Sequence, residues 1–208
     1  PQKPSLQVLY KQGDTEAATK DIRGSIKVKN TGTKPVNLSD VKVRYWFTKD
    51  LASSQEFSCD YAHLSESMIT GRFVDLENPV ENADNYLEIG FDSSAGILGP
   101  GSDTGEIQFR IVKGGFESYD QSNDYSYIAD AKDFTENPNI TAYVDSVLAY
   151  GIPPIEESSD MMYGDLNGDG KVTSTDLTIM KRRVLKMIDE FSVPDKYGDL
   201  NGDGKITS

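Results

Sequence analysis

Several runs in the first 150 residues place a hydrophobic side chain at every second position, and this period of two constrains the fold more than any other feature. The runs lie at residues 25–29, 41–47, 87–91 and 107–111. A period of two puts alternate side chains on opposite faces of a strand, one face buried and one facing water. Turn-forming segments such as Gly99-Pro100-Gly101 separate the runs. The pattern predicts a mainly β fold, a sandwich or jelly roll, over residues 5–152.

The period changes after residue 152. Pro153 and Pro154 are followed by the polar stretch IEESSD, and we interpret residues 153–160 as a linker. Further on, apolar residues at helical spacing predict a helix over 177–188. These residues are Leu177, Met180, Val184, Met187 and Ile188. We therefore expect a first domain over 1–152, the linker, and a second domain over 161–208.

One eleven-residue sequence occurs twice in the second domain, as GDLNGDGKVTS at 164–174 and GDLNGDGKITS at 198–208. The first copy has the oxygen spacing of a calcium-binding loop that closes on an acidic twelfth position. Its expected ligands are Asp165, Asn167, Asp169, the carbonyl of Lys171, Thr173 and Asp176, and the second copy offers Asp199, Asn201 and Asp203. The alternative is an Asp- and Asn-rich turn without a metal.

The paired DLNGDGKVTSTD-type loop with a following helix resembles a type I dockerin, a module that attaches secreted proteins to the cohesins of a cellulosome scaffold. The resemblance covers residues 163–208. It implies a calcium-dependent, cohesin-facing surface made of Ser174, Thr175, Lys181, Arg182 and Lys186. From the residues alone, these side chains would form a solvated helix face. Because Ser208 precedes position twelve of the second loop, we expect the second repeat of the dockerin to be incomplete.

Several stretches of the first domain resemble a family 3 carbohydrate-binding module. They are VKNTG (28–32), FSCDY (57–61), NADNYLEIGF (82–91), YDQSNDYSY (119–127) and AYVDSVLAYG (142–151). The resemblance implies a nine-stranded jelly-roll sandwich with a structural calcium. The calcium positions carry over to Thr48, Asp50, Asp120, Asn123 and Asp124. Oxygen donors from two distant segments suit calcium better than a transition metal, although Asp and Asn are also ordinary turn residues.

The same resemblance implies a planar strip of side chains that binds cellulose. Its expected members are Asp60, Tyr61, Gln108, Arg110 and Phe116. Aromatic faces would stack on sugar rings while the polar members bond the hydroxyls. Tyr61 stands where binders often have His, Phe116 stands where strong binders have Trp, and the loop at 63–71 has no Tyr. The alternative for Asp60, Gln108 and Arg110 is a weak surface ion pair.

Composition and missing motifs narrow the function. A net charge of −13 and a pI near 4.5 argue against nucleic acid and anionic membranes as partners. Cys59 is the single cysteine, so no intrachain disulfide can form. No nucleophile elbow, HExxH motif or phosphate-cradling Gly loop occurs. We predict a secreted, non-catalytic cellulose- or polysaccharide-binding chain, tethered to a scaffoldin by its dockerin. The alternative is an accessory module that assists an adjacent glycoside hydrolase.

Overall fold

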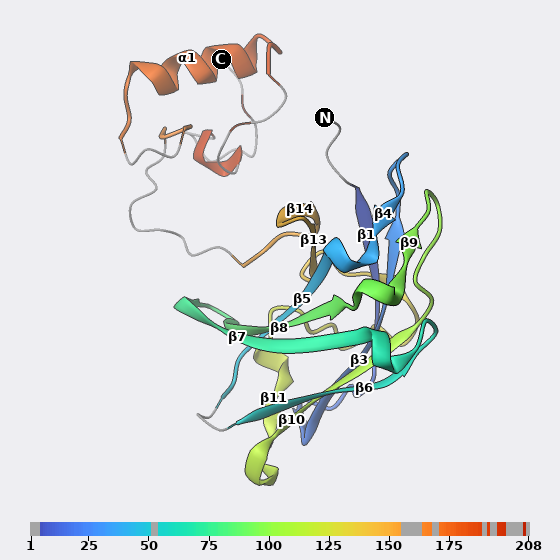
Figure 1. Ribbon diagram of the computed structural model, residues 1–208. Helices are drawn as coiled ribbons and strands as arrows, with labels where there is room; N and C mark the ends of the chain where they lie inside the picture. The colour runs from blue at the N-terminus through green and yellow to red at the C-terminus, as the bar shows by residue number, and fades with distance from the viewer. Residues whose placement is uncertain are drawn as a thin grey trace. The chain divides into compact units, whose positions relative to one another are not determined.

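The computed structural model describes residues 5–50, 54–154, 164–167, 171–188, 191, 195–198 and 206. The chain separates into two compact units, Pro1–Pro154 and Ile155–Ser208. The first unit is built mainly of strands, and the second contains a helix (Figure 1).

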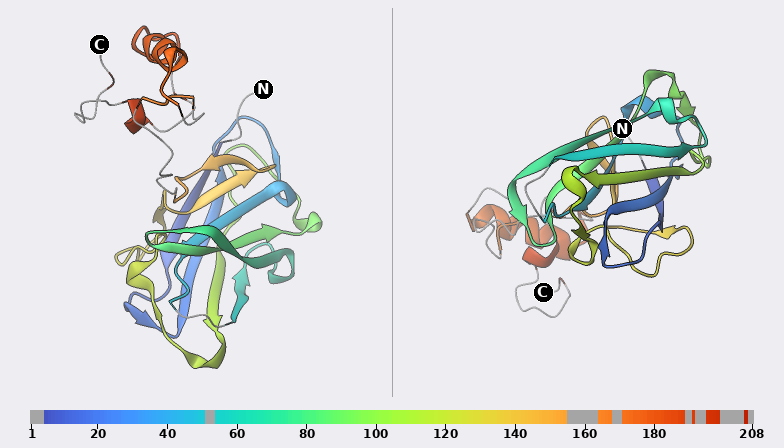
Figure 2. Two further views of the ribbon diagram at one scale, coloured as in Figure 1. Left: turned by 90° about the vertical axis from the view of Figure 1, so that its left-hand side faces the viewer. Right: turned by 90° about the horizontal axis from the view of Figure 1, so that it is seen from below.

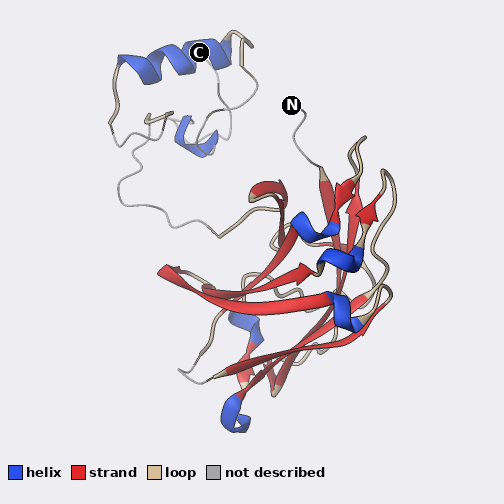
Figure 3. Cartoon of the chain, viewed as in Figure 1, coloured by secondary structure: helices blue, strands red, loops and turns tan. Residues whose placement is uncertain are grey.

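Two antiparallel sheets of five strands each face one another in the first unit (Figures 2 and 3). Sheet I has the order β12 (Thr135–Glu136), β1 (Leu6–Gln12), β3 (Asp21–Asn30), β10 (Ile107–Lys113), β6 (Gln55–Ala62). Sheet II has the order β14 (Val147–Tyr150), β13 (Thr141–Val144), β5 (Val41–Phe47), β8 (Ala83–Phe91), β7 (Ile69–Val80). Two short ladders join β2 (Ala18–Thr19) to β11 (Tyr119–Asp120) and β4 (Val36–Asn37) to β9 (Ile97–Leu98).

The expected nine-stranded jelly-roll sandwich is confirmed. Within the described residues, nine strands are longer than two residues, and all nine belong to the two sheets. The alternation predicted for 25–29, 41–47 and 107–111 becomes β3, β5 and β10. In β10 every second side chain, beginning with Ile107, is buried.

Aromatic rings fill the space between the sheets. Tyr45 of sheet II packs on Tyr10 and Phe109 of sheet I, with ring centroids 6.0 and 5.5 Å apart. All three side chains are at most 1% exposed. Burial of apolar area on this scale is the main favourable term for such a domain.

Strand β8 of sheet II, which lies between β5 and β7, differs from the expected pattern. Residues 87–91 alternate in sequence, yet β8 is buried on both faces, with Glu88 only 5% exposed. Side chains of β5 cover the outer face: Trp46 packs on Tyr86 with centroids 4.6 Å apart, and its Nε1 donates to Thr141 Oγ1 at 3.0 Å. Trp46 therefore covers part of the outer face of sheet II.

The segment 63–71, expected to be a loop, is more ordered than that. It contains a 3₁₀ turn at Glu66–Met68 and the start of β7 at Ile69. The prediction missed β7 because this edge strand is half-exposed along its length and has no clean period of two.

The second unit has one α-helix among its described residues, α1 (Ser174–Val184), and a 3₁₀ turn at Asp195–Gly198. The helix starts and ends earlier than the predicted 177–188. Thr173 is the N-cap and forms a capping box with Asp176, which fixes the start. Lys186, with a positive φ of 55°, lies just beyond the end. No helix in the described part of the chain is long and apolar enough to cross a membrane.

The predicted apolar stripe of this helix was partly wrong. Leu177 is 54% and Met187 64% exposed. The side facing the small core carries Ile179 and Met180, which pack with Ile188 and Ile206 against a cluster of Leu166, Phe191 and Tyr197. The capping box turns Asp176 inward, and the residues three and four positions later follow it onto the same face.

Candidate functional sites

Four of the five residues of the predicted cellulose strip lie on the outer face of sheet I. Arg110 Nη2 forms an ion pair with Asp60 Oδ1 at 2.9 Å, and both side chains are about one-third exposed, at 34% and 37%. Gln108 stands beside Tyr61 in the β10–β6 register. The side chain of Phe116 lies outside the described part of the structure. The period-two prediction that Gln108 and Arg110 face outward is confirmed.

A β-bulge in β6 brings Asp60 and Tyr61 to the outer face of sheet I. Gln108 pairs with Tyr61 and Phe109 pairs with Cys59, so Asp60 is the extra residue between them. Cys59 packs against the core, while Asp60 is exposed and Tyr61 is 43% exposed. The bulge therefore lets two consecutive residues, Asp60 and Tyr61, reach the solvent side of one strand.

Hydrogen bonds hold the polar side chains of this face in place. Gln108 Nε2 donates to Glu106 Oε1 at 3.0 Å, and Lys11 Nζ reaches the same oxygen at 3.2 Å. The bond from Gln108 lowers the pKa of Glu106, which keeps this acceptor charged. Arg110 Nε is buried and meets no acceptor in the described residues. The outer face of sheet I thus presents hydrogen-bond donors and acceptors that neighbouring side chains hold in place.

The ion-pair alternative for this face is compatible with the geometry. The Asp60–Arg110 pair exists, and such exposed pairs contribute little stability. A guanidinium carries five N–H donors, however, so the bond to Asp60 leaves others for a ligand.

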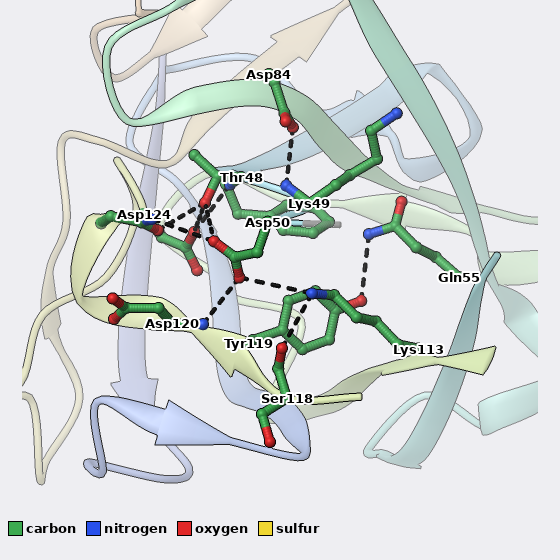
Figure 4. Close-up of polar contacts among 12 residues, drawn as sticks. Thr48, Lys49, Asp50, Gln55, Asp84, Lys113, Ser118, Tyr119, Asp120 and Asp124 are labelled. Carbon is green, nitrogen blue, oxygen red and sulfur yellow. Dashed lines mark hydrogen bonds and ion pairs between the residues drawn. The ribbon is translucent and has the colours of Figure 1, made fainter. Parts of the chain in front are cut away.

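The five residues expected to hold calcium in the first unit lie where β5 and β11 end, and Figure 4 shows four of them, Thr48, Asp50, Asp120 and Asp124. The Thr48 hydroxyl lies 2.6 Å from Asn123 Oδ1, 3.1 Å from Asp50 Oδ1 and 3.2 Å from Asp124 Oδ1. Asp120 is the exception. Its backbone N–H donates to Asp50 Oδ2 at 2.8 Å, while its carboxylate accepts from Ser122 N at 3.1 Å.

The charge balance of this cluster points to a cation. Asp124 is 6% exposed, and its Oδ2 has no partner among the described residues. Burial raises the pKa of Asp124 to about 8, and nearby Asp50 adds to the rise. In the described residues no three His, Cys, Asp or Glu side chains are arranged to hold a metal. Two carboxylates with amide and hydroxyl oxygens are still a donor set that fits calcium.

A buried lysine that was not predicted from the sequence lies beside this cluster. Lys113 Nζ lies 3.6 Å from Asp50 Oδ2, and its side chain has no exposed surface. The amine also donates to the Ser118 carbonyl at 3.1 Å and lies 4.2 Å from the centre of the Tyr119 ring. The alternation of β10 could have indicated this lysine, because Lys113 occupies a position that faces the core, where a lysine is unusual.

A second unpredicted group lies on the outer face of sheet II. Glu88 accepts from Arg44 Nε at 3.0 Å and from Arg72 Nε at 2.8 Å. The Arg44 guanidinium lies over the rings of Tyr143 and Tyr86, at 4.3 and 4.6 Å. The group neutralises a buried carboxylate and covers the sheet, so we regard it as structural.

The first predicted calcium loop of the second unit is closed by Asp176. Its Oδ1 accepts from the backbone of Leu166 at 2.9 Å, and its Oδ2 accepts from Thr173 N at 2.8 Å and Thr173 Oγ1 at 3.0 Å. These bonds lower the pKa of Asp176. Asp165, at position one, is 1% exposed. Asn167 and Lys171 are described, whereas Asp169, Asp199, Asn201 and Asp203 lie outside the described residues.

The residues expected to face a cohesin are all exposed. Ser174 and Thr175 open α1, Lys181 and Arg182 lie in its last turn, and Lys186 follows its end. Exposed Leu177 and Leu185 lie on the same helix and at its C-cap.

Two family models match the chain. The cellulose binding domain model, CBM_3, covers residues 7–151, and the dockerin type I domain model covers residues 163–208. Neither describes a catalytic domain.

Curated relatives match the first unit as part of longer proteins. Beta-mannanase/endoglucanase A of Caldicellulosiruptor saccharolyticus is 44% identical over 149 residues, which is 72% of this chain and 11% of that protein. Cellulosomal-scaffolding protein A of Acetivibrio thermocellus is 36% identical over 159 residues, 72% of this chain and 8% of that protein. The chain therefore spans only a small part of these relatives.

Solved structures show the same fold. CBM3b of the major scaffoldin subunit ScaA from Acetivibrio cellulolyticus has a TM-score of 0.69 and 37% identity, covering 72% of this chain and 97% of that one. A biomass sensing module of an Rsgi-like protein from Clostridium thermocellum has a TM-score of 0.70 and 35% identity, covering 72% and 99%. The chain thus belongs to the cellulose binding domain family as a family 3 carbohydrate-binding module, and a type I dockerin domain follows that module.

Proposed function

We propose that this chain is a secreted, non-catalytic module that binds cellulose or a related plant polysaccharide through the outer face of sheet I, and that its dockerin attaches it to a cohesin. We assign the module to 1–152, the linker to 153–160 and the dockerin to 161–208. The observation that carries the proposal is the grouping of Tyr61, Gln108 and Arg110 on the outer face of sheet I, with Gln108 bonded to Glu106 and Arg110 bonded to Asp60.

The chemistry of this group suits a flat, neutral, hydroxyl-rich ligand. Tyr61 supplies an exposed ring for stacking on a sugar face, and Gln108 and Arg110 supply donors. Glu106 and Asp60 fix the side chains of Gln108 and Arg110 before the ligand binds, which lowers the entropic cost of association. We include Phe116 as a second stacking residue on the strength of the resemblance alone.

We also propose that calcium is the cofactor of both units. In the first unit it would be held by Thr48, Asp50, Asn123 and Asp124, with the backbone N–H of Asp120 orienting the Asp50 carboxylate. The metal would supply a positive charge for the buried Asp124 Oδ2, which has no partner among the described residues. In the second unit the expected ligands are those of the 165–176 loop, and calcium there would order the surface that meets the cohesin.

The test is depletion of the whole chain from solution by microcrystalline cellulose. We expect the wild type to be depleted and an Arg110→Ala, Phe116→Ala double variant to stay in solution. Arg72→Ala is the matched control, because it removes an arginine that also pairs with a carboxylate but lies on sheet II. Equal depletion of all three would refute the proposed face.

If even the wild type stays in solution, the module does not bind crystalline cellulose, and the accessory role beside a hydrolase becomes the better hypothesis. Capture on an immobilised cohesin with and without a calcium chelator tests the dockerin separately. We expect capture only with calcium.

A further inference from the structure

The buried amine of Lys113 occupies an unusual place for a lysine. Its side chain has no exposed surface, and it enters the sandwich from the end of β10 toward the cluster that we assign to calcium (Figure 4). A lysine seldom becomes fully buried unless a partner compensates its charge. The partner of Lys113 is Asp50, whose Oδ2 lies 3.6 Å from Nζ.

Asp50 therefore lies between two positive charges, the amine of Lys113 and the calcium ion that we expect to bind from solution. Its Oδ1 faces Thr48 and Asn123, on the side of the predicted metal. Its Oδ2 faces Lys113 and the Asp120 amide. The positive charge of Lys113 beside this carboxylate weakens the attraction that the same carboxylate can offer to calcium.

The surroundings hold the amine in this position. The Ser118 carbonyl accepts one of its protons at 3.1 Å, and the centre of the Tyr119 ring lies 4.2 Å from it. Gln55 in turn donates to the Tyr119 hydroxyl at 3.2 Å. The lysine is thus held at the end of its own strand β10 by residues at β11 and, through the Tyr119 hydroxyl, by Gln55 of β6, which is distant in sequence.

We propose that Lys113 is an internal counter-cation of the calcium site: it shares Asp50 with the metal, lowers the affinity for calcium, and keeps the first unit folded when calcium is absent. This inference rests on the proposed calcium site. It assigns Lys113 the role of a positioning and tuning residue, not that of a ligand.

The test measures calcium binding to the whole chain by titration calorimetry after removal of bound metal. We expect Asp124→Asn to abolish calcium binding by the first unit. The binding step that is missing in this variant is therefore the step of the first unit. We expect Lys113→Met to bind calcium about tenfold more tightly at that step, because a positive charge next to a ligand is lost. Lys113→Gln, which keeps a donor for Ser118, should do the same, and Lys113→Arg should resemble the wild type.

A second readout is the unfolding temperature of the first unit in chelator. Lys113→Met and Lys113→Gln should unfold at a lower temperature than the wild type, and calcium should raise their unfolding temperature by more than it raises that of the wild type. Lys27→Met controls for net charge, since it removes a lysine from the outer face of sheet I. It should change neither readout.

The possible outcomes separate this inference from the calcium site itself. Unchanged calcium affinity in folded Lys113→Met and Lys113→Gln would overturn the role of Lys113 and leave the site standing. A binding step that appears only once Lys113 is replaced would support the inference in its strongest form. The absence of the step from the wild type and from every Lys113 variant would overturn both.

Discussion

Asp124 has one carboxylate oxygen bonded to Thr48 and another that is buried without a partner among the described residues. Burial raises its pKa from the ordinary value of 3.8 to about 8. Between these two values the metal-free folded protein holds a proton that the unfolded chain has released. The free energy of unfolding must therefore fall as the pH rises through this window.

We predict that, in chelator, the free energy of unfolding of the first unit decreases from pH 5 to pH 8 by up to about 1.4 kcal/mol per pH unit. Asp124→Asn should remove this slope, and calcium should suppress it because the metal favours the charged carboxylate. Urea denaturation followed by tryptophan fluorescence measures this unit alone, since Trp46 is the single tryptophan of the chain. A wild-type slope equal to that of Asp124→Asn would contradict the prediction.

At the scale of elements, α1 depends on its first turn. Thr173 accepts from Thr175 N at 3.2 Å and bonds Asp176, so one threonine both caps the helix and closes the loop. We predict that Thr173→Ala destabilises the second unit by about 1 kcal/mol. Faster amide hydrogen exchange at residues 177–180 would show it. Thr178→Ala is the control: its hydroxyl only donates to the Ser174 carbonyl of the preceding turn, and it should exchange like the wild type.

The elements also show what a sequence can and cannot predict. The strands β3, β5 and β10 could be predicted from alternating hydrophobic residues, because each strand has one face on the core. The edge strand β7, and the face of α1 that packs on the small core, could not be predicted from the sequence. Each depends on contacts made elsewhere, β7 on pairing with β8 and α1 on the bonds of Asp176 to the loop.

The same limit applies to the sites. The resemblance placed Asp50 and Asp124 near one another, and the structure brings them together around the Thr48 hydroxyl. Lys113 shares no motif with them and is joined to them only by the fold. The outward positions of Gln108 and Arg110 followed from simple alternation, whereas the bulge at Asp60 is visible only in the pairing of β6 with β10.

At the scale of the whole molecule, each unit has its own hydrophobic core. The second is small, with Leu166, Phe191 and Tyr197 at its centre. We predict two separate transitions in calorimetry of the whole chain. Asp124→Asn should shift only the transition of the first unit, and Asp176→Asn only that of the second, because each removes bonds within one unit. A single transition that both variants shift would show instead that the units unfold together.

The extra residue in β6 has a consequence for how such modules can diversify. β6 is the edge strand of sheet I, so lengthening or shortening it by one residue leaves the pairing of β10 with β3 untouched. An insertion or deletion confined to the bulge changes the spacing between surface groups such as Asp60 and Tyr61, while Phe57, Cys59 and Ala62 on either side keep their contacts with the core. For protein engineering, this edge is a place where chain length, and not only residue identity, can serve as a variable for retuning ligand preference.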